Sequence, residues 1–464
     1  MHYDLIIIGA GPGGYVCAIR ASQLGQKVAI VDKEWLGGIC LNVGCVPSKS
    51  LLRNAEIAHM LRHRGGEFGF SCENLQLDYG VAVKRSRRVA QRMTKGIAFL
   101  MKKNDIAVHK GAARLTSNSS VEVTGTDRAV STLTAGNIVV ATGARAAGPA
   151  ALSADGDRVL TYREAILQEH VPASVVVVGG GAIGVEFATI WSAYGSQVTL
   201  VEMLPRILPL EDEQVSAELT RAFKKRGIEV LAGAKVKRLQ RGAQNVEVAV
   251  STESGVHTVT AEQALVAVGF APNSENLGLS ALGMERDEGG FVKVDAGMRT
   301  SVAGVFAVGD VTGKLQLAHV ASAQGVVAAE TMAGEPTIEL DYKTMPRATY
   351  CHPEVASFGY SEAEAREAGY EVKTARFDFR ANCKALGLGD YGGWVKVVSD
   401  ARYGEILGAH LIGPQVTELL PELTLAHNME LTGAEIARNI HAHPTLSEAV
   451  MEAAHGLAGE IIHA

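Results

Sequence analysis

The order of hydrophobic and polar residues along the first half of the chain predicts strands separated by helices. Residues 4–8 form a short apolar run typical of a buried parallel strand, residues 15–24 have helical spacing, and residues 27–31 form a second apolar run. The same succession returns later, over residues 175–178, 185–194 and 198–201. Such alternation predicts an α/β fold with parallel sheets.

The rest of the chain predicts further helices, an antiparallel region and a last domain of different character. The expected elements are charged helices over 56–103, a strand and turn over 138–143, antiparallel strands over 235–260, buried strands over 264–269 and 304–310, and a helix over 319–332. From about residue 340, strand-like stretches near 347–350, 394–398 and 406–412 alternate with helical ones. This predicts a separate α+β domain.

Glycine-rich turns follow the first strand of each repeated unit. Gly9, Gly11 and Gly14 have G-x-G-x-x-G spacing between strand and helix, and Asp32 ends the next strand. In this context a pyrophosphate lies on the helix N-terminus while the acid binds ribose hydroxyls. The second unit repeats the pattern 170 residues later with Gly179, Gly181, Gly184 and Glu202. Two dinucleotide sites are therefore predicted.

Glu202 also predicts the cofactor of the second site. A carboxylate there accepts hydrogen bonds from a 2′-hydroxyl and repels a 2′-phosphate, which favours NAD over NADP. Arg206 follows closely and would counter that repulsion in part.

Cys40 and Cys45 form the most informative pair of side chains. Residues five apart do not face each other on a straight helix, so a disulfide between them requires a bend, which Gly44 and Pro47 permit. Lys49 places a cation nearby, which favours a thiolate. The spacing alone equally allows two buried structural thiols.

A second candidate stretch lies near the C-terminus, where His443 is followed by Pro444. Two interpretations of Glu448 stay open here. The carboxylate either orients His443 as a base, or it completes a capping box with Thr445 at the start of a helix over residues 446–457.

Composition excludes several function classes. The 464 residues include 51 glycines, only 5% are aromatic, and the net charge is −6, which argues against nucleic acid as a partner. The basic stretch 84–92 is interpreted as a solvated helix face. Six cysteines make no disulfide scaffold, and residues 30–58 hold no further Cys or His for a metal. No apolar stretch is long enough to span a membrane, and a strand close to Met1 leaves no room for a signal peptide, so a soluble cytoplasmic protein is expected.

These motifs resemble those of the pyridine nucleotide–disulfide oxidoreductase family. The resemblance covers the whole chain and is carried by residues 37–49, the two glycine motifs, residues 305–310 and residues 441–448. It implies two Rossmann-like domains, for FAD and NAD, and a C-terminal α+β dimerisation domain. The implied ranges are 1–148 and 271–340 for FAD, 149–270 for NAD, and 341–464 for dimerisation.

The same resemblance implies which residues contact the cofactors. FAD would contact Gly9, Gly11, Gly14, Asp32, Lys33, Lys49, Ala113, Thr142, Gly143, Ala144, Asp310, Gln316, Leu317, Ala318 and His319. NAD would contact Gly179, Gly181, Ile183, Gly184, Glu202, Val236 and Gly269. Three positions depart from the usual family residues: Asp32 replaces Glu, Ala144 replaces Ser and Ile39 replaces Thr.

The resemblance further implies a redox-active Cys40–Cys45 disulfide, with Lys49 paired to Glu186 beside the flavin. The implied activity is oxidation of protein-bound dihydrolipoyl-lysine with reduction of NAD+. His443, held by Glu448, would act as base on the disulfide of the other subunit of a homodimer. Lipoyl-bearing acyltransferase or carrier proteins of 2-oxoacid dehydrogenase or glycine cleavage complexes are the implied partners.

Three other functions agree less well with the sequence. A glutathione-type disulfide reductase would generally use NADPH, which Glu202 disfavours. Mercuric reductase would need a cysteine pair near the C-terminus, whereas the last cysteine is Cys383. A purely structural docking subunit would not need Cys40, Cys45 and His443.

Overall fold

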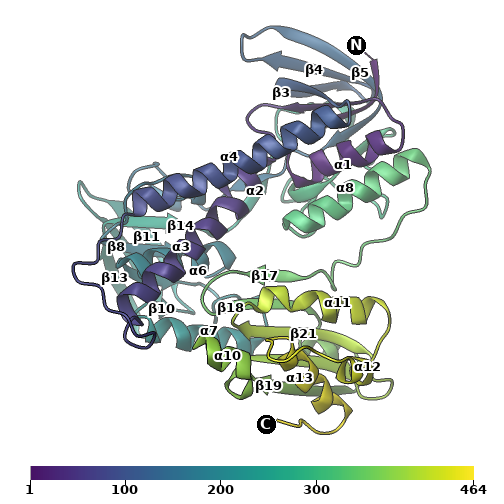
Figure 1. Ribbon diagram of the computed structural model, residues 1–464. Coiled ribbons are helices and arrows are strands. Elements are labelled where there is room, and N and C mark those ends of the chain that lie inside the picture. The colour runs from purple at the N-terminus through teal and green to yellow at the C-terminus, as the bar shows by residue number, and fades with distance from the viewer. Residues whose placement is uncertain (1, 464) are drawn as a thin grey trace.

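The computed structural model describes residues 2–463, and its first sheet gathers strands from two separate parts of the chain. β1 lies between β2 and β5, with β3 beyond β2 and β16 beyond β5, all parallel; β3, β4 and β5 also form an antiparallel extension. The strands are β1 (His2–Ile8), β2 (Val28–Asp32), β3 (Ala107–Ser117), β4 (Ser120–Gly125), β5 (Val130–Val140) and β16 (Val305–Ala307). Helices α1 (Pro12–Gln23) and α8 (Ala318–Ala333) lie side by side on this sheet (Figure 1).

The second sheet is wholly parallel and lies between β5 and β16 in the chain. Its order is β10-β9-β8-β14-β7, and α6 follows β8 as α1 follows β1. Its elements are β7 (Val159–Leu160), α5 (Tyr162–Ala165), β8 (Ser174–Val178), α6 (Ala182–Tyr194), β9 (Gln197–Val201), α7 (Glu213–Lys225), β10 (Glu229–Leu231) and β14 (Gln263–Val266). The predicted antiparallel region is confirmed as β11 (Lys235–Arg241), β12 (Val246–Thr252) and β13 (Gly255–Ala261). A short ribbon pairs β6 (Ala144–Ala146) with β15 (Phe270–Pro272).

The C-terminal domain is an antiparallel sheet of order β17-β18-β21-β20-β19 covered by helices, as the α+β prediction requires. The sequence pattern missed β18 and β19, because the first is buried along its whole length and the second is a half-exposed edge strand, so neither has regular alternation. The strands are β17 (Arg347–Thr349), β18 (Glu354–Gly359), β19 (Val372–Asp378), β20 (Trp394–Asp400) and β21 (Ile406–Gly413). The helices are α9 (Glu362–Glu367), α10 (Cys383–Leu388), α11 (Leu420–Asn428), α12 (Gly433–Arg438) and α13 (Glu448–Ala458).

Three helices lie between β2 and β3 and connect the first two sheets (Figure 1). They are α2 (Gly38–Val43), α3 (Cys45–His63) and α4 (Tyr79–Lys103), so the predicted helical region starts earlier than residue 56 and is interrupted at residues 64–78. Short 3-10 turns are η1 (Ala150–Leu152), η2 (Ser280–Leu282), η3 (Gly309–Thr312), η4 (Phe379–Ala381) and η5 (Val416–Glu418).

The basic stretch on α4 is only in part the solvated face that was predicted. The guanidinium of Arg85 donates to the Ser50 hydroxyl, and that of Arg87 donates to the Asn42 carbonyl. These two side chains therefore fasten α4 to α2 and α3. Arg85 is nevertheless exposed, as Lys84 and Arg88 are, and only Arg87 is half-buried.

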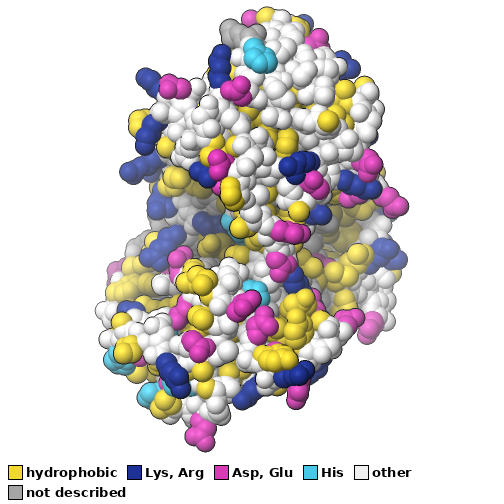
Figure 2. Space-filling view, turned by 90° about the vertical axis from the view of Figure 1, so that its right-hand side faces the viewer, with side chains coloured by type: hydrophobic (Ala, Val, Ile, Leu, Met, Phe, Trp, Pro, Cys, Tyr) yellow, Lys and Arg dark blue, Asp and Glu magenta, His cyan; other side chains and the backbone are white. Residues whose placement is uncertain are grey.

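The molecule is hollowed between the upper and the lower part of Figure 2. Figure 2 shows a recess at this level, with hydrophobic side chains along it. Large hydrophobic side chains are exposed on the C-terminal domain as well, among them Leu425, Met429 and Ile440, the last 95% exposed. A surface of this kind is typical of a protein that is covered by a partner.

Candidate active site

The bend expected between the two cysteines is present. Gly44 separates α2 from α3, so Cys40 lies in one helix and Cys45 begins the next. A Cβ on Gly44 would lie 3.0 Å from the Ile39 carbonyl oxygen, which shows how tightly the chain turns. Both cysteines are thiols in this structure, and the two sulfurs are in hydrogen-bond contact. They are therefore close enough to be joined by a modest movement.

The two thiols differ in acidity. The hydrogen bond with Cys40 and then the Lys49 ammonium hold the pKa of Cys45 below its ordinary value. The same hydrogen bond and burial raise the pKa of Cys40. Cys45 is thus the sulfur that carries negative charge when the pair is reduced, as a cation one helical turn away favours.

Lys49 is held by a carboxylate from the second sheet's domain. Its ammonium lies 2.9 Å and 3.0 Å from the two carboxylate oxygens of Glu186, on α6. Glu186 also accepts a hydrogen bond from the backbone N–H of Tyr350, at 3.0 Å, and the Tyr350 ring centroid lies 4.7 Å from the Lys49 nitrogen. Three regions of the chain therefore meet beside the cysteines.

The two glycine motifs have matching geometry. A Cβ on Gly14 would lie 1.9 Å from the Gly9 carbonyl oxygen, and one on Gly184 would lie 1.9 Å from that of Gly179. The middle glycines, Gly11 and Gly181, have no heavy atom near a Cβ position. The outer glycines are required by packing, whereas the middle ones leave open space, which is what approach of a pyrophosphate needs.

The cysteine helix packs directly against the first glycine motif. A Cβ on Gly38, which begins α2, would lie 2.6 Å from the Gly11 Cα, and the Gly37 N–H donates to the Ala10 carbonyl at 2.8 Å. The open space at Gly11 and the two thiols thus belong to one continuous region.

The acids that end β2 and β9 also behave alike. Asp32 accepts hydrogen bonds from the backbone N–H groups of Ala10, at 2.8 Å, and Glu34, at 2.7 Å. Glu202 accepts from those of Gly180 and Leu204, both at 2.7 Å. Both carboxylates brace the neighbouring glycine turn. Oδ1 of Asp32 also accepts the Trp35 N–H, at 2.9 Å, so Oδ2 of Asp32 and both oxygens of Glu202 keep a lone pair for a ribose hydroxyl. Arg206 instead bonds the Pro209 carbonyl, at 3.4 Å.

Two other predicted FAD residues have polar side-chain groups without partners among the described residues: Asp310 is half-buried and the Gln316 nitrogen is buried. The Asp310 carboxylate, in η3, has no hydrogen bond among residues 2–463, and burial raises its pKa to about 6. The Gln316 side-chain nitrogen is likewise buried and unpartnered. Such groups normally have partners, so this region fits a ligand that supplies hydroxyl and acceptor groups, as the ribityl chain and pyrophosphate of FAD do.

The remaining predicted residues lie around these two regions. On the FAD side, Lys33 follows β2, Ala113 is in β3, Thr142 and Gly143 follow β5, Ala144 begins β6, and Leu317, Ala318 and His319 form the start of α8. On the NAD side, Ile183 is in α6, Val236 is in β11, and Gly269 follows β14. The Thr142 hydroxyl already donates to the Asn273 carbonyl, at 2.7 Å. His319 uses its Nε2 on the Pro346 carbonyl, at 2.8 Å.

His443 and Glu448 form a pair within the C-terminal domain. The His443 Nδ1 lies 2.8 Å from Oε1 of Glu448, whose other oxygen accepts the Thr445 N–H, also at 2.8 Å. Burial would raise the pKa of Glu448, but the hydrogen bonds from Thr445 and His443 hold it below its ordinary value. The carboxylate therefore holds the His443 ring and also binds the Thr445 backbone. The capping box itself was wrong, since α13 begins at Glu448 with Ser447 as its cap.

This pair lies far from the cysteines of its own chain. Figure 1 places α13 in the lower domain and α2 in the upper half of the molecule. The His443 side chain is 67% exposed and its Nε2 is free to face outward. A single chain thus holds the thiols and the imidazole in separate places.

Two tyrosines at the site were missed by the sequence analysis. Tyr350 touches Lys49, and Tyr15 lies near both thiols, so that burial and then Cys40 and Cys45 raise its pKa. Tyr15 directly follows the first glycine motif, so its place in the sequence could have identified it as a site residue. Tyr350 lies 301 residues beyond Lys49, and only the fold brings the two together.

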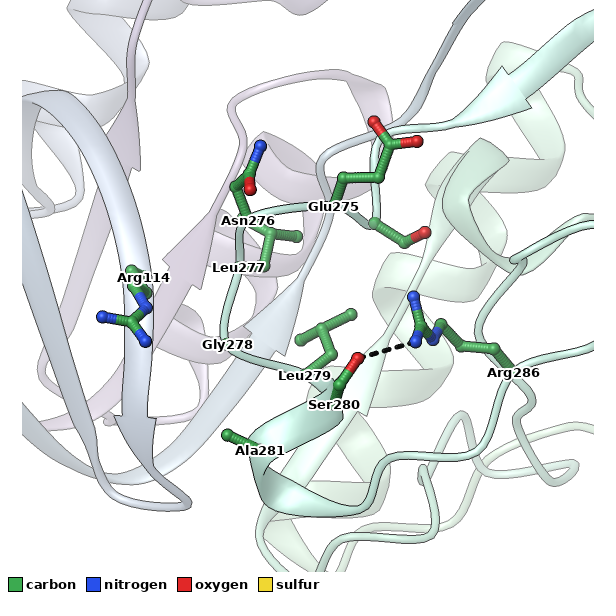
Figure 3. A pocket seen from close by; sticks show the side chains of 10 residues that line it. Arg114, Glu275, Asn276, Leu277, Gly278, Leu279, Ser280, Ala281 and Arg286 are labelled. Carbon is green, nitrogen blue, oxygen red and sulfur yellow. Dashed lines mark hydrogen bonds between the residues drawn. The ribbon is translucent and has the colours of Figure 1, made fainter.

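A cavity elsewhere has no part in this chemistry. It has a volume of about 460 Å³ and lies where β3 meets the segment 274–286. Figure 3 shows Arg114 across from Arg286, whose guanidinium donates to Ser280 at 2.7 Å. Nothing in the cavity belongs to the predicted site. Within residues 2–463 there is also no cluster of metal-binding side chains, and no helix in that range is long and apolar enough to cross a membrane.

Comparisons with known proteins agree on one family. Residues 3–325 match the family model for pyridine nucleotide-disulphide oxidoreductase, and residues 345–454 match the dimerisation domain of the same group. The chain is 50% identical to dihydrolipoyl dehydrogenase of Mycobacterium leprae and 46% identical to that of Corynebacterium glutamicum, over 100% of this chain and 99% of each relative. The crystal structure of LpdA from Mycobacterium tuberculosis superposes with a TM-score of 0.91 at 27% identity, covering 98% of this chain and 99% of that one.

Proposed function

Since the chain belongs to the pyridine nucleotide-disulphide oxidoreductase family, we propose that it is the enzyme that oxidises protein-bound dihydrolipoyl-lysine to lipoyl-lysine and reduces NAD+ to NADH. Its full-length similarity to dihydrolipoyl dehydrogenases supports this substrate. The observation that carries the proposal is the contact between the Cys40 and Cys45 sulfurs, beside Lys49 and next to the open space at Gly11.

The partner subunit's His443 begins the dithiol reaction as general base. Because Nδ1 of His443 is held by Glu448, Nε2 is the nitrogen that accepts the proton of a substrate thiol. The resulting thiolate attacks the Cys40 sulfur, the Cys40–Cys45 bond breaks, and Cys45 leaves as a thiolate beside Lys49. The second substrate thiol then displaces the Cys40 sulfur from the mixed disulfide. The proton of this second thiol passes to Cys40, and the substrate leaves as a cyclic disulfide.

The residues around the thiols fit FAD. When bound, FAD would supply the two-electron redox chemistry that couples the reduced cysteine pair to NAD+. Gly11 leaves room for its pyrophosphate, Asp32 offers lone pairs to a ribose, and Asp310 and Gln316 offer unpartnered polar groups to its chain. Lys49 would then hold its charge next to the flavin ring.

The second glycine motif binds NAD. Gly181 leaves space for the pyrophosphate, and Glu202 is a carboxylate with lone pairs still available to a 2′-hydroxyl. Arg206 bonds a backbone carbonyl instead of lying on that carboxylate, which supports NAD over NADP.

The working unit is a homodimer, as the matched dimerisation domain indicates. We assign residues 1–148 and 271–340 to the FAD domain, 149–270 to the NAD domain and 341–464 to the dimerisation domain. Lipoyl-bearing acyltransferase or carrier proteins of 2-oxoacid dehydrogenase or glycine cleavage complexes would bring the substrate, in the cytoplasm. A role as a docking subunit is compatible with this but does not explain the paired thiols.

Anaerobic titration of the purified yellow protein tests the proposal. Dihydrolipoamide should produce a long-wavelength thiolate–flavin band, and NAD+ added afterwards should be reduced to NADH. Glutathione with NADP+ is the matched control for the alternative reductase. NADPH formation from glutathione, with no response to dihydrolipoamide, would contradict the proposal.

A further inference from the structure

The Lys49 ammonium is held from two sides, and only one of them is an ion pair. The Glu186 carboxylate binds it at 2.9 Å and 3.0 Å. On another side the face of the Tyr350 ring lies 4.7 Å from the nitrogen, within the range in which a cation is attracted to an aromatic face. The Lys49 side chain is still 34% exposed, so the ion pair alone does not enclose it.

Tyr350 is itself fixed at this position. It directly follows β17, its backbone N–H donates to the same Glu186 carboxylate at 3.0 Å, and its ring packs on the large hydrophobic core around α3 and α6. Lys49, Glu186 and Tyr350 thus form a closed triangle of contacts. The hydrogen bond to Glu186 fixes the Tyr350 backbone, and the ring cannot turn away from Lys49 without losing its packing on the core.

The location of the ammonium matters because two negative groups compete for it. Cys45 as a thiolate and Glu186 both attract it. The Lys49 ammonium lowers the pKa of Cys45, whereas the Glu186 carboxylate raises it. Within its own chain, the groups that face the Cys45 sulfur are Cys40, Lys49, Glu186 and, from α1, Tyr15. Lys49 is the single cation among these four, so a small displacement of its nitrogen changes the balance.

We propose that the Tyr350 ring is a positioning group for Lys49, which keeps the ammonium at a point from which it reaches both Glu186 and the Cys45 sulfur. Through this contact the C-terminal domain takes part in setting the charge of the thiol pair in its own chain. The inference rests on the proposed function, because it assigns a purpose to the charge on Cys45.

The test compares two substitutions of one residue in the full-length holoenzyme. Tyr350→Leu removes the ring, whereas Tyr350→Phe keeps it and removes only the hydroxyl. The protein is reduced, and the rate of Cys45 alkylation by iodoacetamide is measured against pH, with the modified cysteine located by peptide fragmentation. Since a cation–π contact of this kind is worth about 0.5–1 kcal/mol, Tyr350→Leu should lower the thiolate-to-thiol ratio about threefold and raise the midpoint pH. Tyr350→Phe should leave the midpoint in place.

A matched control is available in the same domain. Lys343 also lies 4.7 Å from a tyrosine ring centroid, that of Tyr360, at a site with no cysteine. Tyr360→Leu should not move the Cys45 midpoint. An unchanged midpoint in Tyr350→Leu, an equal shift in Tyr350→Phe, or an equal shift in Tyr360→Leu would each overturn the proposal.

The long-wavelength band of the reduced holoenzyme gives a second reading. Its pH midpoint should move with that of alkylation in Tyr350→Leu, and its failure to do so would also overturn the proposal. Absence of the band in the unsubstituted protein would instead count against the proposed function, and the alkylation profiles would still decide the role of Tyr350.

Discussion

At the scale of single residues, the site consists of a few groups whose charge depends on their neighbours. The Lys49–Glu186 pair joins residues 137 apart in the chain, and one of its oxygens also binds the backbone at Tyr350. Glu186 is only 8% exposed, whereas an exposed ion pair would be worth little. Because Glu186 is buried, this ion pair affects the charge of its neighbours more strongly than an exposed pair would.

Loss of the His443 imidazole should slow the dithiol half-reaction and spare the NADH half-reaction. His443→Gln should lower dihydrolipoamide oxidation by at least ~10²-fold, the usual scale for a general base, and leave NADH-dependent dye reduction nearly unchanged. Stopped-flow measurement of each half-reaction checks this. His463, 70% exposed and bonded to Glu452 at 2.6 Å, is a similar pair outside the site, so His463→Gln is the control. Equal loss of both half-reactions in His443→Gln would mean that this residue is structural.

Asp310 predicts a pH dependence of stability. Burial raises its pKa from 3.8 to about 6, so the folded flavin-free protein holds this proton more tightly than the unfolded chain does. The stabilisation from this group is complete below the unfolded pKa and is lost as pH rises through about 6. Asp310→Asn, which stays neutral, should remove that part of the pH dependence. Thermal unfolding of both flavin-free proteins across this pH range measures it, and parallel profiles would contradict the argument.

At the scale of elements, the same turn is used twice because the same packing is needed twice. In both units the last glycine of the motif lies against the first, and the strand-ending acid bonds the residue that follows the first glycine. The cysteine helix then packs on only one of these turns, through Gly38. That contact supports the proposal that the first turn belongs to the redox site and that the second turn binds NAD.

The two kinds of glycine in the second motif should respond differently to one added methyl group. Gly184→Ala places a Cβ 1.9 Å from the Gly179 carbonyl oxygen, so it should lower the melting temperature markedly. Gly181→Ala meets no protein atom and should fold normally, but its methyl group occupies the pyrophosphate space, so the KM for NAD+ should rise by roughly tenfold or more. Calorimetry and steady-state kinetics distinguish the two variants. A destabilised Gly181→Ala with normal NAD+ affinity would refute this reading of the motif.

At the scale of the whole molecule, one chain carries two halves of different sites. The two thiols lie in the upper part of the molecule in Figure 1. The exposed His443 lies in the lower, dimerisation domain, which also exposes large hydrophobic side chains. In the two-fold dimer that we propose, each imidazole would meet the thiols of the other chain.

Mixed dimers test this arrangement directly. A purified heterodimer of one Cys45→Ser chain and one His443→Gln chain contains one site with both groups intact, if the base comes from the partner subunit. It should recover about half of the normal activity, whereas each homodimer is nearly inactive. Two differently tagged chains expressed together give the sample. A heterodimer as inactive as its parents would show that base and thiols act within one chain.

Much of this protein could be predicted from the sequence alone. Both glycine turns, their acids and the broken helix between Cys40 and Cys45 depend on short-range geometry, so residue types at fixed spacing were sufficient to predict them. The ordinary alternation of strands and helices is local in the same way. The prediction failed where a strand is buried on both sides, as β18 is, and where the exact start of a helix depends on tertiary contacts, as at Glu448.

Only the tertiary structure decided what surrounds Lys49. No local pattern links residue 49 to residue 186 or to residue 350, because attraction between charges and rings depends on distance in space and is independent of separation along the chain. The same holds for the hydrogen bonds from Arg85 to Ser50 and from Arg87 to Asn42, which no local pattern predicts. The sequence therefore determined which chemical groups the site contains, and the packing of three domains determined which of them touch.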